Sequence, residues 1–422
     1  MNGRHAVLQV RDRWGALPMP FIAGILDSSS YVYIILGFKE AYFYSLVIGL
    51  KIIFAILTKL SPRLSERFWP FLIILALAAP ISSAINKSEL IDLTRNFLVC
   101  ISIILTLILA QSNLREYGKG IAFSGMAICF MYLTYVSMDM ISHKGDRYYF
   151  FSDSHPNLGG ELISSAVIMA TISLKPKHFF MLAVPALYCT FLLQSRTSTI
   201  AILISVFCFI TLWSKWKFGW KATRWAILTT PALLLGVFAS LSAIGSEETQ
   251  EAFDLLFDSV FLVDDEYRGG ESGFSGRDQH WGDAIEVIMN HTFFGAGPNF
   301  MDRLGVLQPH NWILYAISQF GFLGLVLVLV FIAAAYEAAR RDPIRLAVLT
   351  PLFVPWLLND RFLNFNAYPF ILYIVVFTSF RHGDPSRRPV PLRHAPQRGR
   401  AWARSIPRGP IRTPRATGRP AR

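Results

Sequence analysis

Two arginines and one histidine lie at positions where their side chains could take part in a reaction. Arg196 lies in a short polar stretch between two apolar runs, Arg277 lies in a long polar segment, and His310 opens the next apolar run. Guanidinium groups bind phosphate oxygens in pairs and keep their proton. A histidine at a helix start is favoured as neutral imidazole, which can act as a general base. These residue types suit group transfer from a phosphorylated donor.

The two arginines also have a purely structural explanation. Arg196 could snorkel to lipid headgroups, and Arg277 could be an ordinary solvated arginine in an acidic segment. The same choice applies to His155 and Glu161, which lie near the start of another apolar run. They could orient an acceptor or belong to a helix cap. We favour capping for the neighbouring Asp153 and a site-lining role for His155.

The apolar runs that surround these residues predict membrane spans. Hydrophobic residues make up 53% of the 422-residue chain and charged residues only 16%, whereas a soluble domain has about 25% charged residues. Several runs, such as Asn96–Leu114 and Trp225–Ser246, contain no charge, and they approach or exceed the roughly 20 apolar residues that a spanning helix needs. The composition predicts an all-α integral membrane protein. It excludes a soluble enzyme, a secreted disulfide scaffold and a free nucleic-acid-binding domain.

About twelve transmembrane helices account for the runs. The predicted spans are residues 17–37, 41–58, 68–86, 96–114, 120–138, 158–174, 178–195, 197–214, 225–246, 309–336, 346–359 and 362–380. Lys and Arg are concentrated in the segments that lie on the same side as the N-terminus. Positive residues mark the cytoplasmic side, so we expect both termini to be cytoplasmic.

The spans divide the chain into five predicted parts. These are a cytoplasmic N-terminus at 1–16, helices one to nine at 17–246, a long periplasmic loop at 247–308, helices ten to twelve at 309–380, and a cytoplasmic tail at 381–422. The tail holds 12 Arg and one acidic residue, and so carries nearly all of the net charge of +12. It is also rich in Pro and poor in large apolar residues, which predicts disorder.

The periplasmic loop predicts short amphipathic helices. It holds 13 Asp and Glu against three Arg. Apolar residues recur at helical spacing in two stretches, Phe253, Leu256, Phe257 and Val260 in the first and Trp281, Ile285 and Ile288 in the second. A glycine-rich hinge at 268–276 separates them. Two such helices could form a lid on the outer leaflet, or could pack on the helix bundle.

Two charged residues fall inside predicted spans, and metal-site patterns are missing from the sequence. Asp27 and Lys51 are the most awkwardly placed charges, and they could be functional or could pair with each other. The four cysteines lie in apolar runs, and the sequence contains no CxxC or HExxH motif. We therefore expect no metal site and no cofactor.

A series of short motifs occurs in a fixed order between residues 155 and 335. The motifs are Ser195-Arg196-Thr197, Ser275-Gly276-Arg277, Trp281, Phe294-Gly295-Ala296-Gly297, His310-Asn311 and Gly321-Phe322-Leu323-Gly324. On a twelve-span map with one long outer loop, this set resembles the O-antigen ligase and O-antigen/exopolysaccharide polymerase superfamily. Members of that superfamily are bacterial membrane glycosyltransferases that use polyprenyl-diphosphate-linked glycans.

The resemblance implies a catalytic centre of Arg196, Arg277 and His310. Four further residues are expected to bind substrate: His155, Glu161, Trp281 and Asn311. The expected donor is an undecaprenyl-diphosphate-linked glycan, and the acceptor is a saccharide or lipid A–core. Membrane lipids and other polysaccharide-assembly proteins are the remaining expected partners, with no nucleic acid. The implied location is the bacterial inner membrane, with the active site facing the periplasm.

Two choices remain open within this interpretation. The loop at 247–308 is short, and a site for a bulky lipid A–core acceptor should need a longer loop to enclose it. The loop length therefore favours a polymerase of polysaccharide repeats over a ligase. A different class of function is a lipid-linked glycan flippase or another transporter, which twelve spans and buried Asp27, Lys51 and Glu161 would permit. Carriers built from repeats should show matching broken helices in both halves, and the sequence shows no such symmetry.

Overall fold

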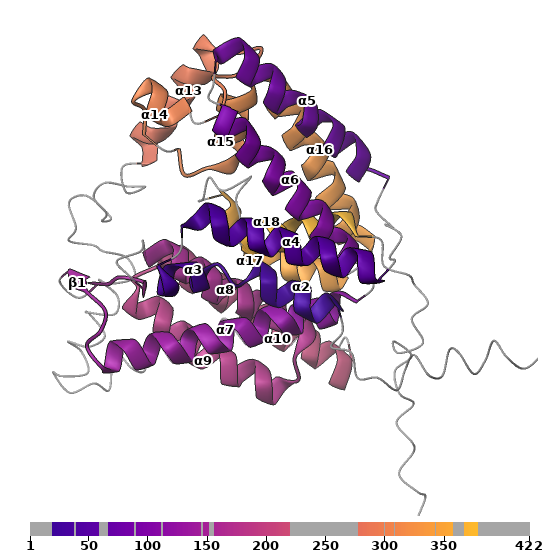
Figure 1. Ribbon diagram of the computed structural model, residues 1–422. Helices are drawn as coiled ribbons and strands as arrows, with labels where there is room; N and C mark the ends of the chain where they lie inside the picture. The colour runs from indigo at the N-terminus through magenta and orange to yellow at the C-terminus, as the bar shows by residue number, and fades with distance from the viewer. Residues whose placement is uncertain are drawn as a thin grey trace, which may run out of the picture. The chain divides into compact units, whose positions relative to one another are not determined.

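The computed structural model describes most of the predicted membrane region (Figure 1). The described residues are 19–37, 39–58, 66–87, 90–110, 113–144, 147–151, 156–219, 277–298, 300–307, 309–341, 343–357 and 367–378. They all belong to one compact unit, Met1–Ser379. Several predictions fall outside them: the N-terminal segment, the ninth span, the first loop helix, the glycine hinge, His155 and the C-terminal tail.

Helices make up nearly all of the described structure. The first half of the chain forms α2 (Met19–Asp27), α3 (Tyr31–Leu36), α4 (Glu40–Thr58), α5 (Phe68–Asn86), α6 (Leu90–Ala110), α7 (Leu114–Ser137), α8 (Pro156–Ser173), α9 (Pro176–Leu192) and α10 (Arg196–Phe218). The second half forms α13 (Arg277–Asn290), α14 (Phe300–Leu304), α15 (Trp312–Phe320), α16 (Phe322–Arg341), α17 (Pro343–Leu357) and α18 (Ala367–Phe377). A short antiparallel pair, β1 (His143–Lys144) and β2 (Arg147–Tyr148), precedes α8.

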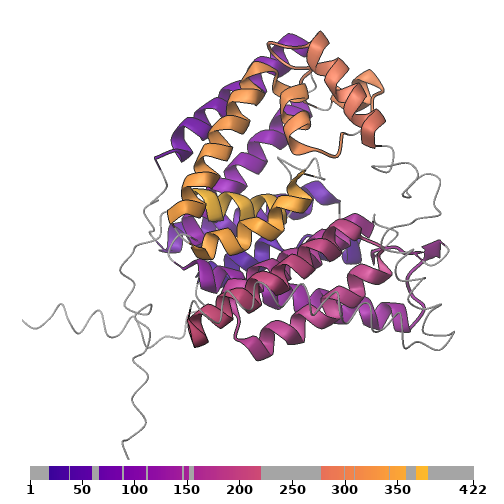
Figure 2. The same ribbon diagram turned by 180° about the vertical axis from the view of Figure 1, so that it is seen from behind.

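Four of the described helices are long and apolar enough to cross a membrane. They are α5, α7, residues Arg196–Lys215 of α10, and α16. Helices α7, α8, α9 and α10 pack side by side (Figures 1 and 2). Their large apolar side chains divide between buried positions and exposed ones such as Phe130 and Val184. Apolar side chains exposed along helices of this length are typical of a surface that faces lipid, and they indicate a membrane protein.

Two predicted spans are interrupted. The first breaks between α2 and α3 at residues 28–30, where the Ser28 hydroxyl donates to the carbonyl oxygen of Gly24 at 2.7 Å. The tenth breaks at Gly321, which has a φ of 58° and separates α15 from α16. The first break coincides with the polar stretch from Asp27 to Ser30 and the second with a glycine, but the count of apolar residues over a whole span detects neither.

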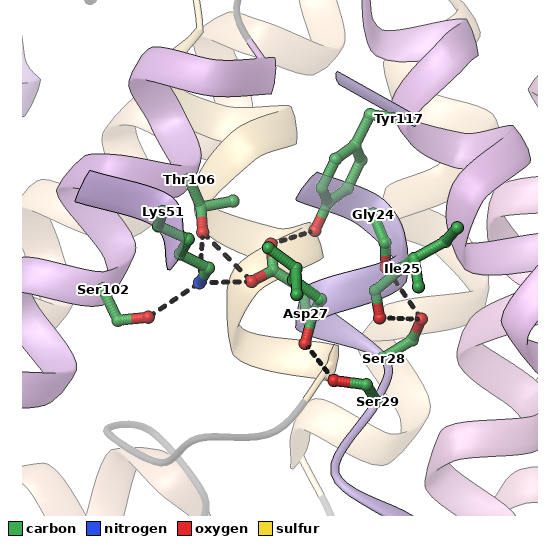
Figure 3. A network of polar contacts seen from close by, with 10 residues as sticks. Gly24, Ile25, Asp27, Ser28, Ser29, Lys51, Ser102, Thr106 and Tyr117 are labelled. Carbon is green, nitrogen blue, oxygen red and sulfur yellow. Dashed lines mark hydrogen bonds and ion pairs between the residues drawn. The ribbon is translucent and has the colours of Figure 1, made fainter. Parts of the chain in front are cut away.

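A buried ion pair joins the N-terminal helices (Figure 3). Lys51 of α4 pairs with Asp27 of α2, and both side chains are 0% exposed. The Lys51 ammonium also donates to the hydroxyls of Ser102 and Thr106 on α6, at 2.7 and 2.8 Å. The Asp27 carboxylate accepts from Thr106 at 3.1 Å and from the Tyr117 hydroxyl of α7 at 2.9 Å. The two charges therefore pair with each other, one of the two alternatives that the sequence left open.

Candidate functional site

Helix α13 lies against the segment that carries His310 (Figure 1). The indole nitrogen of Trp281 donates to the carbonyl oxygen of Pro309 at 2.8 Å. The imidazole rings of His280 and His310 have centroids 5.6 Å apart and planes tilted by 32°. The segment before α15 and the start of α13 are thus in direct contact, although Trp281 and Pro309 are 28 positions apart in the sequence.

Arg277 is the first residue of the same helix. Residues three and four positions apart share one face of an α-helix, so the Cα of Arg277 lies above those of His280 and Trp281. Further along this face, Ala284 is buried and its carbonyl oxygen accepts from the Ser318 hydroxyl of α15 at 3.3 Å. The backbone of α13 therefore places Arg277 on the face that packs against His310 and α15.

His310 and Asn311 form the entry to α15. His310 has a positive φ of 45°, and Asn311 returns to an extended conformation as the helix cap. The side-chain oxygen of Asn311 accepts from the backbone N–H groups of Ile313 and Leu314, at 3.0 and 3.2 Å. An asparagine in this position satisfies N–H groups that the first turn leaves without partners. Asn311 thus has a structural role, and its amide NH₂ remains a donor that could reach a substrate.

Arg196 lies at the start of α10, beside the first turns of α8. The residue before it, Ser195, is buried and its hydroxyl donates to that of Ser198 at 2.9 Å. A side chain at Gly160 would collide with both serines, so α8 and the α10 entry pack at backbone distance here. Glu161 follows Gly160 and is also buried. The half-buried Arg196 and the buried Glu161 are therefore each next in sequence to a residue of this close contact.

The predicted site residues thus fall into two groups, and the structure shows contacts within each group. One group holds His310, Trp281 and the helix that Arg277 opens. The other holds the Arg196 turn and the start of α8 with Glu161. Within the described residues, no group of three or more His, Cys, Asp or Glu could hold a metal ion.

The two glycine motifs bind each other at the far end of α15. The backbone N–H groups of Ala296 and Gly297 donate to the carbonyl oxygens of Ser318 and Gln319, at 2.7 and 3.0 Å. These carbonyls belong to the last turn of α15, which has no further helical residue to bind them. Gly295 has a φ of 68° and packs on the backbone of residues 319 and 320, where any side chain would collide. The motifs therefore fix α13 and α15 relative to each other.

Three polar side chains, Ser82, Asn86 and Arg303, join the end of α5 to the segments after α13 and at the end of α15; we call them the polar clamp. The Asn86 amide donates to the carbonyl oxygen of Gly295 at 2.9 Å, and the Ser82 hydroxyl donates to that of Gln319 at 2.8 Å. The Arg303 guanidinium donates to the carbonyl oxygens of Asn86, at 2.9 Å, and of Ala296. These side chains were not predicted from the sequence. Their only local signals are a polar end to an apolar span and one arginine in an acidic loop.

We expect the replacement of Asn86 by leucine to weaken the clamp and lower the activity of the protein. The change leaves the carbonyl oxygen of Gly295 without the amide donor, and an unsatisfied buried polar group costs about 1–3 kcal/mol. Thermal unfolding in detergent and glycan-transfer rates should both fall. Replacing the neighbouring Ile85, which is exposed, with alanine is the matched control and should change neither. An Asn86→Leu protein with unchanged stability and activity would contradict the clamp.

The second predicted loop helix is present, with a different buried face. Helix α13 covers the predicted stretch of Trp281, Ile285 and Ile288, but Ile285 is exposed. The residues buried on this helix are Ala284 and Val287, and Val287 joins a small core with Ala296 and Phe300. The predicted stripe was wrong at Ile285 because the small side chain of Ala284, rather than the large one of Ile285, permits the close approach to α15.

The comparisons with known proteins agree with the order of the motifs. Residues 181–329 match the family model described as O-antigen ligase. No curated protein matches the chain. The matched segment contains Arg196, Arg277, His310 and both glycine motifs. The match confirms the resemblance predicted from these motifs: residues 181–329 are similar to the O-antigen ligase and polymerase superfamily.

Proposed function

We propose that the protein is a membrane glycosyltransferase that moves a glycan from undecaprenyl diphosphate to a sugar hydroxyl. The observation that carries this proposal is the contact between α13 and the His310 segment, which groups a potential base with the helix that Arg277 opens. The family match over residues 181–329 contains all of these residues. The proposed catalytic residues are His310, Arg277 and Arg196.

In the proposed reaction His310 removes the proton from the acceptor hydroxyl. The hydroxyl oxygen then attacks the anomeric carbon, and the bond from that carbon to the diphosphate oxygen breaks on the opposite face, with inversion. The leaving diphosphate gains negative charge, which Arg196 and Arg277 stabilise; one well-placed donor in a dry site contributes about 3–4 kcal/mol. The imidazolium of His310 later releases its proton to water. The donor bond supplies the energy, so the proposed reaction needs neither ATP nor an ion gradient, and the two guanidinium groups take the role that a metal ion has in other glycosyltransferases.

The remaining predicted site residues would bind the acceptor and orient it. Trp281 presents a half-buried ring beside the Pro309 carbonyl, and Asn311 can donate through its amide. Glu161 follows Gly160, which packs on the Arg196 turn, and we propose that His155, which lies outside the described residues, also contacts the acceptor. Joining the two groups of residues around one donor diphosphate is the central claim of the proposal.

We further propose about twelve spans in the bacterial inner membrane, cytoplasmic termini, and a loop at 247–308 that faces the periplasm with the site. Contacts between helix ends support this arrangement. Arg67, before α5, pairs with Glu337 near the end of α16 at 2.7 Å, and Arg345 at the start of α17 donates to the carbonyl oxygens of Val375 and Thr378 at the end of α18. All of these ends are cytoplasmic in the proposed topology. The other end of α5 meets the loop at Gly295.

Polymerisation of polysaccharide repeats is the reaction that we favour, because the loop at 247–308 is short for enclosing a lipid A–core acceptor. The second candidate is an O-antigen ligase, favoured by the description of the matching family model. The lipid-linked and surface glycans of a knockout strain distinguish the two. Single repeats on lipid without polymer indicate a polymerase. Full-length polymer that stays on undecaprenyl diphosphate and is missing from lipid A indicates a ligase.

Lysine in place of Arg196 or Arg277 should lower the transfer rate substantially. Lysine keeps the positive charge but loses the planar pair of donors that binds two phosphate oxygens. The measurement is the initial rate of glycan transfer by purified protein in liposomes. Arg341→Lys is the matched control, because Arg341 is the exposed last residue of α16, at the end of that helix away from the His310 segment, and pairs with Glu337. Full activity in both Arg196→Lys and Arg277→Lys would remove the arginines from diphosphate binding.

Transfer should continue in the presence of EDTA. The proposed stabilisation of the leaving diphosphate comes from guanidinium groups alone, so chelation of divalent cations should leave the rate unchanged. The rate is measured before and after dialysis against EDTA, with added Mg²⁺ as the comparison. Loss of activity on chelation and recovery with Mg²⁺ would contradict the arginine-only mechanism.

A further inference from the structure

Helix α13 has three distinct flanks. One flank packs on the protein, with Ala284 and Val287 buried. Beside it, Ile285 and Met289 lie four residues apart and are 52% and 73% exposed. On the side of Met289 away from Ile285, Glu286 and Asn290 are exposed polar residues. A helix with a packed flank, an exposed apolar flank and a polar flank fits a boundary between protein, lipid and water.

The exposed apolar flank continues onto a membrane-length helix. Phe293 follows Met289 in the turn after α13 and is 74% exposed. Its carbonyl oxygen accepts from the backbone N–H of Phe322 at 3.1 Å. Phe322 is the first residue of α16, where it, Leu325 and Leu329 are exposed along one face. The apolar surface of α13 therefore adjoins the exposed surface of a helix that is long and apolar enough to cross a membrane.

The polar clamp holds the exposed apolar surface of α13 next to the end of α5. Asn86, the last residue of α5, donates to the carbonyl oxygen of Gly295, two residues after Phe293. Helix α5 is another of the membrane-length helices. The turn after α13 is therefore tied to the end of α5 and to the start of α16, two helices that are long and apolar enough to cross a membrane.

We propose that α13 is an interfacial helix, with Ile285, Met289 and Phe293 inserted at the boundary between the headgroups and the acyl chains of the outer leaflet. The occupant of this surface is the lipid bilayer, because the surface continues that of α16 and lies level with the end of α5. Interfacial helices bury an apolar flank at this depth and keep a polar flank in water. Glu286 marks the water-facing flank.

The consequence for substrate binding rests on the proposed function. The packing face of α13 carries His280 and Trp281 against the His310 segment. Anchoring α13 in the interface holds this face where the diphosphate of a membrane-embedded donor lies. The donor would then approach from the lipid side, and the surface of α13 would form part of its entry.

The test uses the full-length protein in liposomes with a fluorescent label at single positions. The four native cysteines are replaced by alanine, and Met289→Cys or Ile285→Cys is labelled with the environment-sensitive fluorophore NBD. Glu286→Cys on the polar flank is the matched control. Quenching is measured with phospholipids that carry a nitroxide high on the acyl chain and, separately, with a water-soluble nickel chelate. If the cysteine-free protein does not fold, the native cysteines are kept and the signal of the labelled parent is subtracted.

We expect the label at 289 and at 285 to be quenched by nitroxide lipid at least about twofold more than the label at 286. The label at 286 should respond to the nickel chelate instead. Equal response of all three positions to the chelate would overturn the proposal. Protection of 285 and 289 from both quenchers would also overturn it and would indicate a second copy or another protein on this surface. Neither result depends on activity, so failure of the proposed function leaves this test intact.

Discussion

Replacing His310 with alanine should abolish glycan transfer while the protein remains folded. The imidazole is the proposed general base, and loss of such a group typically lowers a rate by about 10²–10⁴-fold. Its ring lies beside that of His280 and directly before the Asn311 cap, so the backbone is held by contacts that do not need the imidazole. The measurement combines the transfer rate in liposomes with thermal unfolding in detergent.

The control for His310 is a histidine outside the proposed site. His178 is exposed near the start of α9, on the predicted cytoplasmic side, and His178→Ala should keep both activity and stability. A His310→Ala protein with a near-normal transfer rate would remove His310 from the mechanism. Loss of activity together with loss of folding would indicate a structural role.

Replacing Lys51 with methionine should destabilise the protein strongly. The change leaves the Asp27 carboxylate buried at 0% exposure without its cation, and such a break costs about 3–5 kcal/mol. Lys51 also lies over the ring of Phe370, 4.4 Å from its centroid, so α18 loses a contact as well. Thermal unfolding in detergent should show a large decrease in the midpoint temperature.

The double variant separates a structural pair from a functional one. Asp27→Asn combined with Lys51→Met removes both charges, and replacement of a whole buried pair by uncharged groups is often close to neutral. The double variant should therefore recover much of the stability and activity lost by Lys51→Met. Lys119→Met is the control, because the Lys119–Glu116 pair is partly exposed and such pairs contribute about 0–1 kcal/mol. A stable double variant without activity would show that the ion pair takes part in function.

Helices with an uninterrupted apolar run were the most predictable part of the fold. The predicted span at 68–86 has the same bounds as α5, because hydropathy alone sets the length of such a helix. The breaks at residues 28–30 and at Gly321 were not predicted. Polar residues stand at both places, but a few polar residues do not by themselves end a span, and the direction of the backbone depends on tertiary contacts such as those of Gly321 with residues 293 and 295.

The order of the motifs predicts that Arg277, Trp281 and His310 work together. The structure places Trp281 and the helix that Arg277 opens against the His310 segment, and the roles of these residues stay predictions. The clamp could not be predicted, because Asn86 and Arg303 are 217 positions apart and neither belongs to a local pattern. The role of Asn311 as a cap also depends on where α15 begins, which hydropathy does not define.

The most direct test of the proposed function is a reconstituted transfer assay. Purified protein in liposomes is given an undecaprenyl-diphosphate-linked oligosaccharide and a saccharide acceptor, and both products are measured. We predict a new glycosidic bond and the release of one undecaprenyl diphosphate for each bond formed, with neither product from the His310→Ala protein. Movement of the lipid-linked glycan across the bilayer without any new glycosidic bond would contradict the proposal and would identify the protein as a carrier.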